Sequence, residues 1–81
     1  DGDSMIDAHI ENGDIVIAER TTTAKNGDIV IANVDGEFTM KYFYTKGSTV
    51  WLEPANKHFK PIYPERELTI VAVVRGVMRK Y

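Results

Sequence analysis

Short runs of β-branched and aromatic residues, separated by Gly, Asn, Asp or Pro, dominate this chain of 81 residues. Such runs are typical of strands, and the residues that separate them are typical of turns. A shorter extended piece is expected around Phe59–Tyr63, close to Pro61 and Pro64. The pattern therefore predicts a mostly β fold with five main strands, at Asp14–Glu19, Asp28–Val34, Glu37–Phe43, Thr49–Glu53 and Leu68–Arg79.

The dipeptide Asp35-Gly36 lies between two apolar runs and is a strong turn signal. It favours a two-residue β-hairpin turn, in which both central residues need a positive φ that Asp and Gly tolerate. The turn fixes the register of the hairpin: Val34 faces Glu37, and by counting outward Val30 faces Lys41. Lys41 is thus expected deep in its strand and not at the tip.

Side chains alternate between the two faces of a strand, so the hairpin also predicts which residues share a face. One set is apolar and is expected to form the core: Phe38, Met40 and Tyr42. The opposite face carries Glu37, Thr39, Lys41 and Phe43.

The heptapeptide Asn-Gly-Asp-Ile-Val-Ile-Ala occurs twice, at Asn12–Ala18 and at Asn26–Ala32. The copies begin 14 residues apart, which is too close for the units of a solenoid. We interpret each copy as an Asn-Gly turn that leads into a buried strand, since Asn and Gly both tolerate a positive φ. A phosphate-binding loop is disfavoured, because each copy has one Gly and no Lys-Ser or Lys-Thr follows.

Size and composition allow a single domain, which we expect to span residues 1–81. The formal net charge is −2 and the basic residues are dispersed, so direct nucleic-acid binding by this domain is not expected. The absence of cysteine excludes disulfides and thiolate chemistry. The apolar runs are too short to cross a bilayer, and a cytoplasmic location without membrane contact is expected.

The segment Ser4-Met5-Ile6-Asp7 has the spacing of a helix N-terminus, a Ser followed three residues later by an acid. Only one or two helical turns fit before Asn12-Gly13. In the simplest interpretation Ser4 is a helix cap. A serine at such a position is also compatible with nucleophilic catalysis, because unpaired backbone N–H groups beside it can bind a developing oxyanion.

Lys41 is either a solvated strand lysine or a buried general base. The second role needs a neutral amine near pH 7, so its pKa must fall by about 3 pH units from roughly 10.4, a bias of about 4 kcal/mol against the charged form. A neutral Lys41 can accept the proton of the Ser4 hydroxyl, the Ser-Lys variant of nucleophile activation. The sequence supplies apolar neighbours for such a shift: Phe38, Met40, Tyr42 and Phe43.

Other constellations of reactive residues are weaker. His9 or His58 would complete a Ser-His-Asp triad with Ser4, but the context of neither histidine favours it. Two histidines without a carboxylate cluster do not predict a metal site, and no metal or cofactor is expected. The acidic residues near the start are interpreted as the charge preference of a helix N-terminus: Asp1, Asp3 and Asp7.

Several blocks, in order along the chain, resemble the S24 peptidases, the group of LexA, UmuD and the phage repressors. These blocks are Gly2-Asp3-Ser4-Met5, Gly13-Asp14, Val34–Lys41, Leu52–Asn56, Phe59–Ile62 and Val73–Val77. The interval of 37 residues between Ser4 and Lys41 is usual in that group. Within the group the chain is most similar to UmuD, although Tyr42 stands where LexA-type members often carry Arg.

The resemblance implies a compact fold of twisted β-sheets with one short helix after the nucleophile. It implies a self-cleaving serine peptidase in which Ser4 is the nucleophile, Lys41 is the general base, and the backbone N–H groups of Asp3 and Ser4 are the oxyanion donors. It further implies a homodimer, and self-cleavage stimulated by a RecA filament in the SOS response to DNA damage. For a UmuD-like member, the processed form is expected to partner an error-prone translesion polymerase subunit similar to UmuC.

Two other functions stay open at this point. The chain is alternatively the dimerisation and autocleavage domain of a LexA-like or phage-type repressor, whose N-terminal half binds DNA. In the other alternative it is a plain interaction module, in which Ser4 is only a cap and Lys41 only a surface residue.

The bond that this family cleaves is usually Ala-Gly or Cys-Gly and precedes the serine, and this chain contains neither dipeptide. The upstream strands and the cleavage site are therefore expected to lie outside it, so that this truncated form is not expected to cleave itself. The final strand, Leu68–Arg79, is expected to expose an edge for pairing with a second copy.

Overall fold

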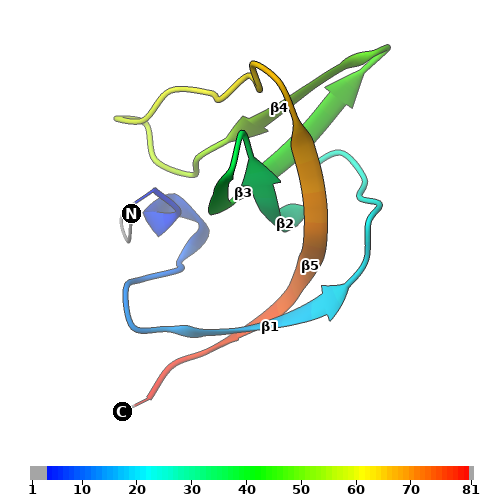
Figure 1. Ribbon diagram of the computed structural model, residues 1–81. Helices are drawn as coiled ribbons and strands as arrows, with labels where there is room; N and C mark the ends of the chain where they lie inside the picture. Colours follow the sequence, from blue (N-terminus) through cyan, green and yellow to red (C-terminus); the bar gives the residue numbers. More distant parts are fainter. Residues whose placement is uncertain (1–3, 81) are drawn as a thin grey trace.

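Five strands and one short 3-10 helix form the computed structural model, which describes residues 4–80. The strands form one antiparallel sheet in the order β1-β5-β2-β3-β4 (Figure 1). The mostly β fold is confirmed. The elements are η1 at Ile6–Ala8, β1 at Ile15–Arg20, β2 at Ile29–Val34, β3 at Glu37–Lys46, β4 at Thr49–Glu53 and β5 at Leu68–Met78.

The hairpin of β2 and β3 has the predicted register. Val34 pairs with Glu37 and Val30 pairs with Lys41. Both turn residues have a positive φ, 50° at Asp35 and 95° at Gly36, as a tight hairpin turn of this kind requires. β3 extends three residues beyond the predicted end, because its second half also pairs with β4.

The helix after Ser4 is a single 3-10 turn. Its N-cap residue is Met5, and no side chain caps it, so the prediction of Ser4 as a helix cap is wrong. His9 ends the turn in the left-handed conformation, with a φ of 61°. Within residues 4–80, no helix is long and apolar enough to cross a membrane.

The extended piece predicted around Phe59–Tyr63 is reduced to one bridge between Ile62 and Leu52, whose N–H and C=O groups bond each other in both directions. The flanking prolines lack N–H groups, which prevents a longer ladder. The last residues of the loop between β4 and β5 are bonded to the hairpin turn instead. The Asp35 carboxylate accepts three consecutive backbone N–H groups, those of residues 65–67, at 2.8–3.0 Å.

The last strand lies inside the sheet, so the prediction of an exposed edge along Leu68–Arg79 is wrong. β1 pairs with Ala72–Met78 and β2 pairs with Leu68–Val73, which makes β1 and β4 the edge strands. In Figure 1, β5 is the long orange strand between them. Sequence periodicity does not distinguish a central strand from an edge strand, because both show alternating apolar residues.

The buried residues form two clusters on opposite faces of the hairpin. The larger cluster consists of Val30, Ala32, Phe43, Leu52, Ile70 and Val73. The smaller cluster consists of Met5, Ile10 and Ala55, against which Met40 and Tyr42 pack. The predicted core face of β3 is therefore partly wrong, since Phe43 joins the larger core and Phe38 is 71% exposed.

Candidate active site

The structure brings Ser4 and Lys41 together in the protein interior. The Lys41 amine donates a hydrogen bond to the Ser4 hydroxyl, with 2.9 Å between Nζ and Oγ. Ser4 is 3% exposed and Lys41 is 7% exposed, so the view of Lys41 as a solvated strand residue is wrong. The smaller apolar cluster holds the segment of Ser4 against β3, which carries Lys41.

Two further acceptors surround the Lys41 amine. Nζ lies 2.6 Å from the Thr39 hydroxyl and 3.1 Å from the Met40 carbonyl. An ammonium group has three N–H donors, and these match the three acceptors. A neutral amine has two N–H donors and one lone pair. When Thr39 and Met40 accept the two donors, the lone pair is left for the Ser4 hydroxyl proton.

Burial lowers the pKa of Lys41, because removing the ammonium from water penalises its charged form. Within residues 4–80, no carboxylate forms an ion pair with Lys41 that would restore the charge. Burial therefore shifts the balance at Lys41 toward the neutral amine that a general base requires.

Two hollows flank this pair. One has a volume of about 420 Å³ and the other of about 450 Å³. Both are lined by Ser4, Phe38, Thr39 and Lys41. Further apolar side chains line the first hollow, among them Ile10, Val16, Ile31 and Met40. The second hollow adds Val34, Phe59 and Ile62.

The strand that carries Lys41 has an open edge beside these hollows. β2 pairs with Glu37–Tyr42 on one side, whereas β4 pairs on the other side only from Tyr42 onward. Among the strands at residues 4–80, none pairs with that second side of residues 37–41. An extended peptide can add to such an edge through main-chain hydrogen bonds, with its side chains in neighbouring pockets. The exposed ring of Phe38 lies on this stretch.

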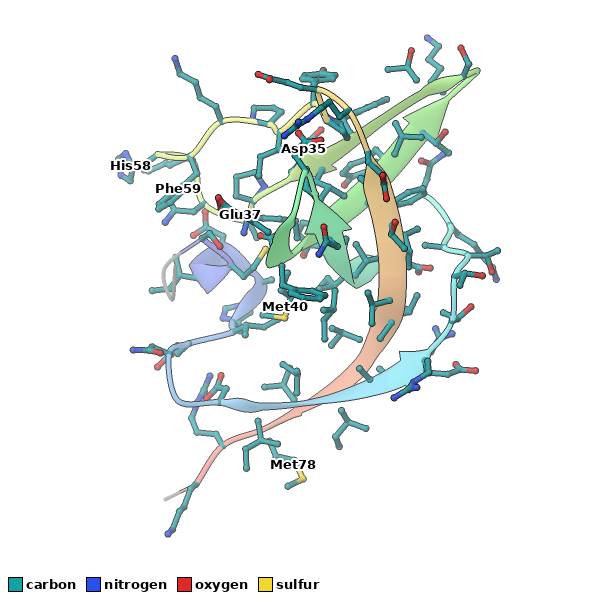
Figure 2. The ribbon with its side chains drawn as sticks, viewed as in Figure 1. Asp35, Glu37, Met40, His58, Phe59 and Met78 are labelled. Carbon is teal, nitrogen blue, oxygen red and sulfur yellow. The ribbon has the colours of Figure 1, made fainter. Side chains whose placement is uncertain are left out.

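The other predicted site residues lie elsewhere or outside the described residues. Asp3, one of the two expected oxyanion donors, falls outside them. His9 and His58 are exposed, and neither lines the two hollows. Figure 2 shows His58 at the outer end of the β4–β5 loop. In the part of the chain that the structure describes, no group of three or more His, Cys, Asp or Glu residues could hold a metal.

Thr39 was predicted on the same face as Lys41, but no role was assigned to it. The sequence did indicate that Thr39 could contact Lys41, because residues two apart on a strand project from the same face. A hydroxyl two positions before a buried lysine is a ready acceptor for its N–H. The Met40 carbonyl had no comparable signal, since its contact depends on how the lysine side chain folds back.

Comparison with known proteins finds one family model and several similar proteins. Residues 1–75 match the family model described as Peptidase S24-like. The chain is 48% identical over 84 residues to a LexA repressor of Desulfatibacillum aliphaticivorans, 49% over 80 residues to one of Thermotoga petrophila, and 46% over 81 residues to one of Clostridium novyi.

These three alignments cover 98–99% of this chain but only 40–41% of each relative, so the chain spans about two fifths of their length. The family model, by contrast, matches all of this chain except its last few residues. From these two findings, the chain belongs to the Peptidase S24-like family.

Proposed function

We propose that this chain is the self-cleaving serine peptidase domain of a LexA-like repressor, with Ser4 as nucleophile and Lys41 as general base. The observation that carries the proposal is the buried contact of 2.9 Å between Lys41 Nζ and Ser4 Oγ. The relatives named LexA repressor favour a repressor over the UmuD-like protein expected from the sequence. A translesion polymerase subunit is therefore a less favoured partner than a DNA-binding half in the same chain.

In the proposed reaction, Ser4 Oγ attacks the carbonyl carbon of a peptide bond while its proton moves to Lys41 Nζ. The resulting ammonium donates to Thr39 and Met40 and passes one proton to the leaving amine as the peptide bond breaks. Water then attacks the acyl group on Ser4, with Lys41 again accepting a proton, and the serine is restored. The backbone N–H groups of Asp3 and Ser4 are the proposed donors to the oxyanion.

The proposed substrate is an extended segment of the complete protein that lies upstream of Ser4. The open edge of β3 and the two apolar hollows support this choice, because they suit a strand with small or apolar side chains. Stimulation by a RecA filament belongs to the proposal through the family resemblance.

A homodimer is also proposed for the complete protein. It is supported by exposed apolar side chains on one face of the β1–β5 pair: Ile15, Ile17 and Met78. Figure 2 shows Met78 pointing away from the rest of the sheet. Sedimentation of an Ile17→Asp variant as a monomer, beside a wild-type dimer, is the expected result.

Replacement of Lys41 by Ala in the full-length protein tests the catalytic proposal. Self-cleavage is expected to slow by about 10²–10⁴-fold, the usual contribution of a general base. Lys46→Ala, which changes an exposed lysine of the same strand, is the matched control and is expected to cleave normally. The wild-type rate should rise with pH as the amine loses its proton, with a midpoint below the ordinary lysine pKa, because burial lowers the pKa of Lys41.

Ser4→Ala should abolish cleavage while leaving the circular dichroism spectrum of the folded protein unchanged. Normal cleavage by either the Ser4→Ala or the Lys41→Ala protein would remove the Ser-Lys mechanism.

A further inference from the structure

Met5, the residue after Ser4, is hydrogen-bonded to Ala55 of the β4–β5 loop. The Ala55 N–H donates to the thioether sulfur of Met5, with 3.4 Å between N and Sδ. The Asp7 N–H donates to the Ala55 carbonyl at 2.6 Å. The loop therefore holds both the side chain of Met5 and the backbone two residues later.

Met5 also makes the main backbone hydrogen bonds of its own segment. Its carbonyl accepts the N–H groups of Ala8 at 3.0 Å and of Ile10 at 3.4 Å. Met5 is 2% exposed and belongs to the smaller buried cluster, whereas the next two residues, Ile6 and Asp7, are exposed. The 3-10 helix of three residues has no side-chain cap, so it does little to orient Ser4 by itself.

We propose that Met5 is a positioning residue, whose thioether sets where Ser4 Oγ lies relative to Lys41 Nζ. The inference rests on the proposed Ser-Lys function and adds a residue to it. Ser4 and Met5 are neighbours, with Cα atoms about 3.8 Å apart, so a shift of Met5 is passed directly to the hydroxyl. A misplacement of about 1 Å in a reacting group can slow a reaction by about 10²-fold.

The sulfur atom matters here in addition to the volume of the side chain. Ala55 is 9% exposed, and its N–H needs an acceptor, because burial separates it from water. Leucine has a similar volume to methionine and fills such sites well, but it offers no acceptor. Glutamine is of similar length and offers a carbonyl oxygen. These two substitutions separate the packing of Met5 from its hydrogen bond.

The test compares Met5→Leu and Met5→Gln in the full-length protein, with Lys46→Ala, at an exposed residue of β3, as the control. Met5→Leu is expected to slow self-cleavage by about 10- to 100-fold. It should also lower Tm by several degrees, because the buried Ala55 N–H loses its acceptor. Exchange of the Ala55 amide hydrogen should become faster. The pH midpoint of the rate should stay in place, because Lys41 stays buried. Met5→Gln should cleave several-fold faster than Met5→Leu, and Lys46→Ala should match the wild type.

Several results would overturn the inference. These are a wild-type rate for Met5→Leu, a slow Met5→Leu protein whose Ala55 amide is still protected, or a folded Met5→Gln protein no faster than Met5→Leu. An upward move of the pH midpoint in Met5→Leu would show that water had reached Lys41, which is packing damage and not positioning. The wild-type protein provides a test without any substitution. Fast exchange of its Ala55 amide hydrogen would contradict the hydrogen bond from the Ala55 N–H to the Met5 sulfur. Failure of the Ser-Lys function itself is recognised separately, by cleavage in the Lys41→Ala protein.

Discussion

The two copies of Asn-Gly-Asp-Ile-Val-Ile-Ala, at Asn12–Ala18 and Asn26–Ala32, begin alike and end in different surroundings. The glycines have nearly the same positive φ, 92° at Gly13 and 89° at Gly27. Each copy then enters a strand directly after its Asp, at the start of β1 and of β2. The same seven residues therefore form the same turn before a strand, here called a corner, twice.

The bonds within the two corners are also the same. The Asp14 carboxylate accepts the Glu11 N–H at 2.8 Å, and the Asp28 carboxylate accepts the Lys25 N–H at 2.9 Å. The backbone bonds run the other way: the Asp14 N–H donates to the Glu11 carbonyl, and the Asp28 N–H donates to the Lys25 carbonyl, both at 3.0 Å. The turn is thus determined locally, by the Asp side chain and by the freedom of Gly.

The strands that follow differ because their neighbours differ. β2 lies between β3 and β5, whereas β1 is an edge strand with one neighbour. The alanine that ends the repeat is fully buried at position 32 and exposed at position 18. The prediction that both copies lead into buried strands is therefore wrong for the first copy. A local sequence sets the corner, and the position of the strand in the sheet sets the burial.

The largest expected difference between the copies comes from placing a carboxylate on the two alanines. Ala32→Asp should lower the free energy of unfolding by at least about 3 kcal/mol, because the charge has no water and no partner there. Ala18→Asp should cost about 1 kcal/mol or less, since the site is exposed. Urea unfolding followed by Trp51 fluorescence measures both. Equal losses would contradict the view that neighbours decide burial.

A smaller and equal effect is expected from replacing the two glycines by alanine. Each substitution forces a side chain into the left-handed region, which should cost about 1–2 kcal/mol in unfolding free energy. An added Cβ meets no atom within 4 Å at either Gly13 or Gly27, so the loss comes from the backbone alone. The two losses should agree within about 0.5 kcal/mol. A larger disagreement would show that the corners are not equivalent.

The smallest effect on stability is expected at the two aspartates, and it depends on pH. Asp14 also accepts two hydrogen bonds from the Arg79 guanidinium, at 2.9 and 2.7 Å, and these bonds hold the pKa of Asp14 below its ordinary value. A carboxyl whose pKa is lowered by folding stabilises the protein above its unfolded pKa of about 3.9, and this stability is lost as the pH falls through the folded pKa.

At pH 7, Asp14→Asn should therefore lower Tm more than Asp28→Asn does. The gap between the wild type and Asp14→Asn should shrink as the pH is lowered from about 4 to about 2. Thermal unfolding at several pH values measures this. A gap that does not change over that range would mean that the Arg79 contact contributes nothing through the charge of Asp14.

Much of the strand layout could be predicted from the sequence, because it depends on neighbouring residues. Thr49–Glu53 has the predicted bounds, both ends of β1 and the start of β2 differ from prediction by one residue, and β2 ends at Val34 as predicted. The hairpin register followed from a two-residue turn, which leaves little choice in how Val30 and Lys41 align. These features depend on φ preferences and alternation alone.

Features that depend on distant parts of the chain could not be predicted in the same way. Phe38 and Phe43 are equally apolar, yet only Phe43 meets the larger core, which is built from β2, β4 and β5. The central place of β5 depends on pairing with both β1 and β2. Alternation identifies a strand but contains no information on which strands lie beside it.

In the candidate site, too, some features depend on neighbouring residues and others on distant parts of the chain. The presence of Ser4 and Lys41 as candidates followed from their local context and from the family resemblance, but their contact of 2.9 Å depends on how the N-terminal segment packs. The role inferred for Met5 was not visible in the sequence, because its partner Ala55 lies 50 residues away.

The separation of Ser4 from Lys41 by 37 residues has a consequence during synthesis. At about 5–20 residues per second, the ribosome adds the lysine roughly 2–7 s after the serine. β2 pairs with β3 on one side and with β5 on the other, and among the strands within residues 4–80, β5 is the last to be translated. In a nascent chain, the hydroxyl of Ser4 and the amine of Lys41 are therefore both present before β5, which completes the pairing of β2, has been translated.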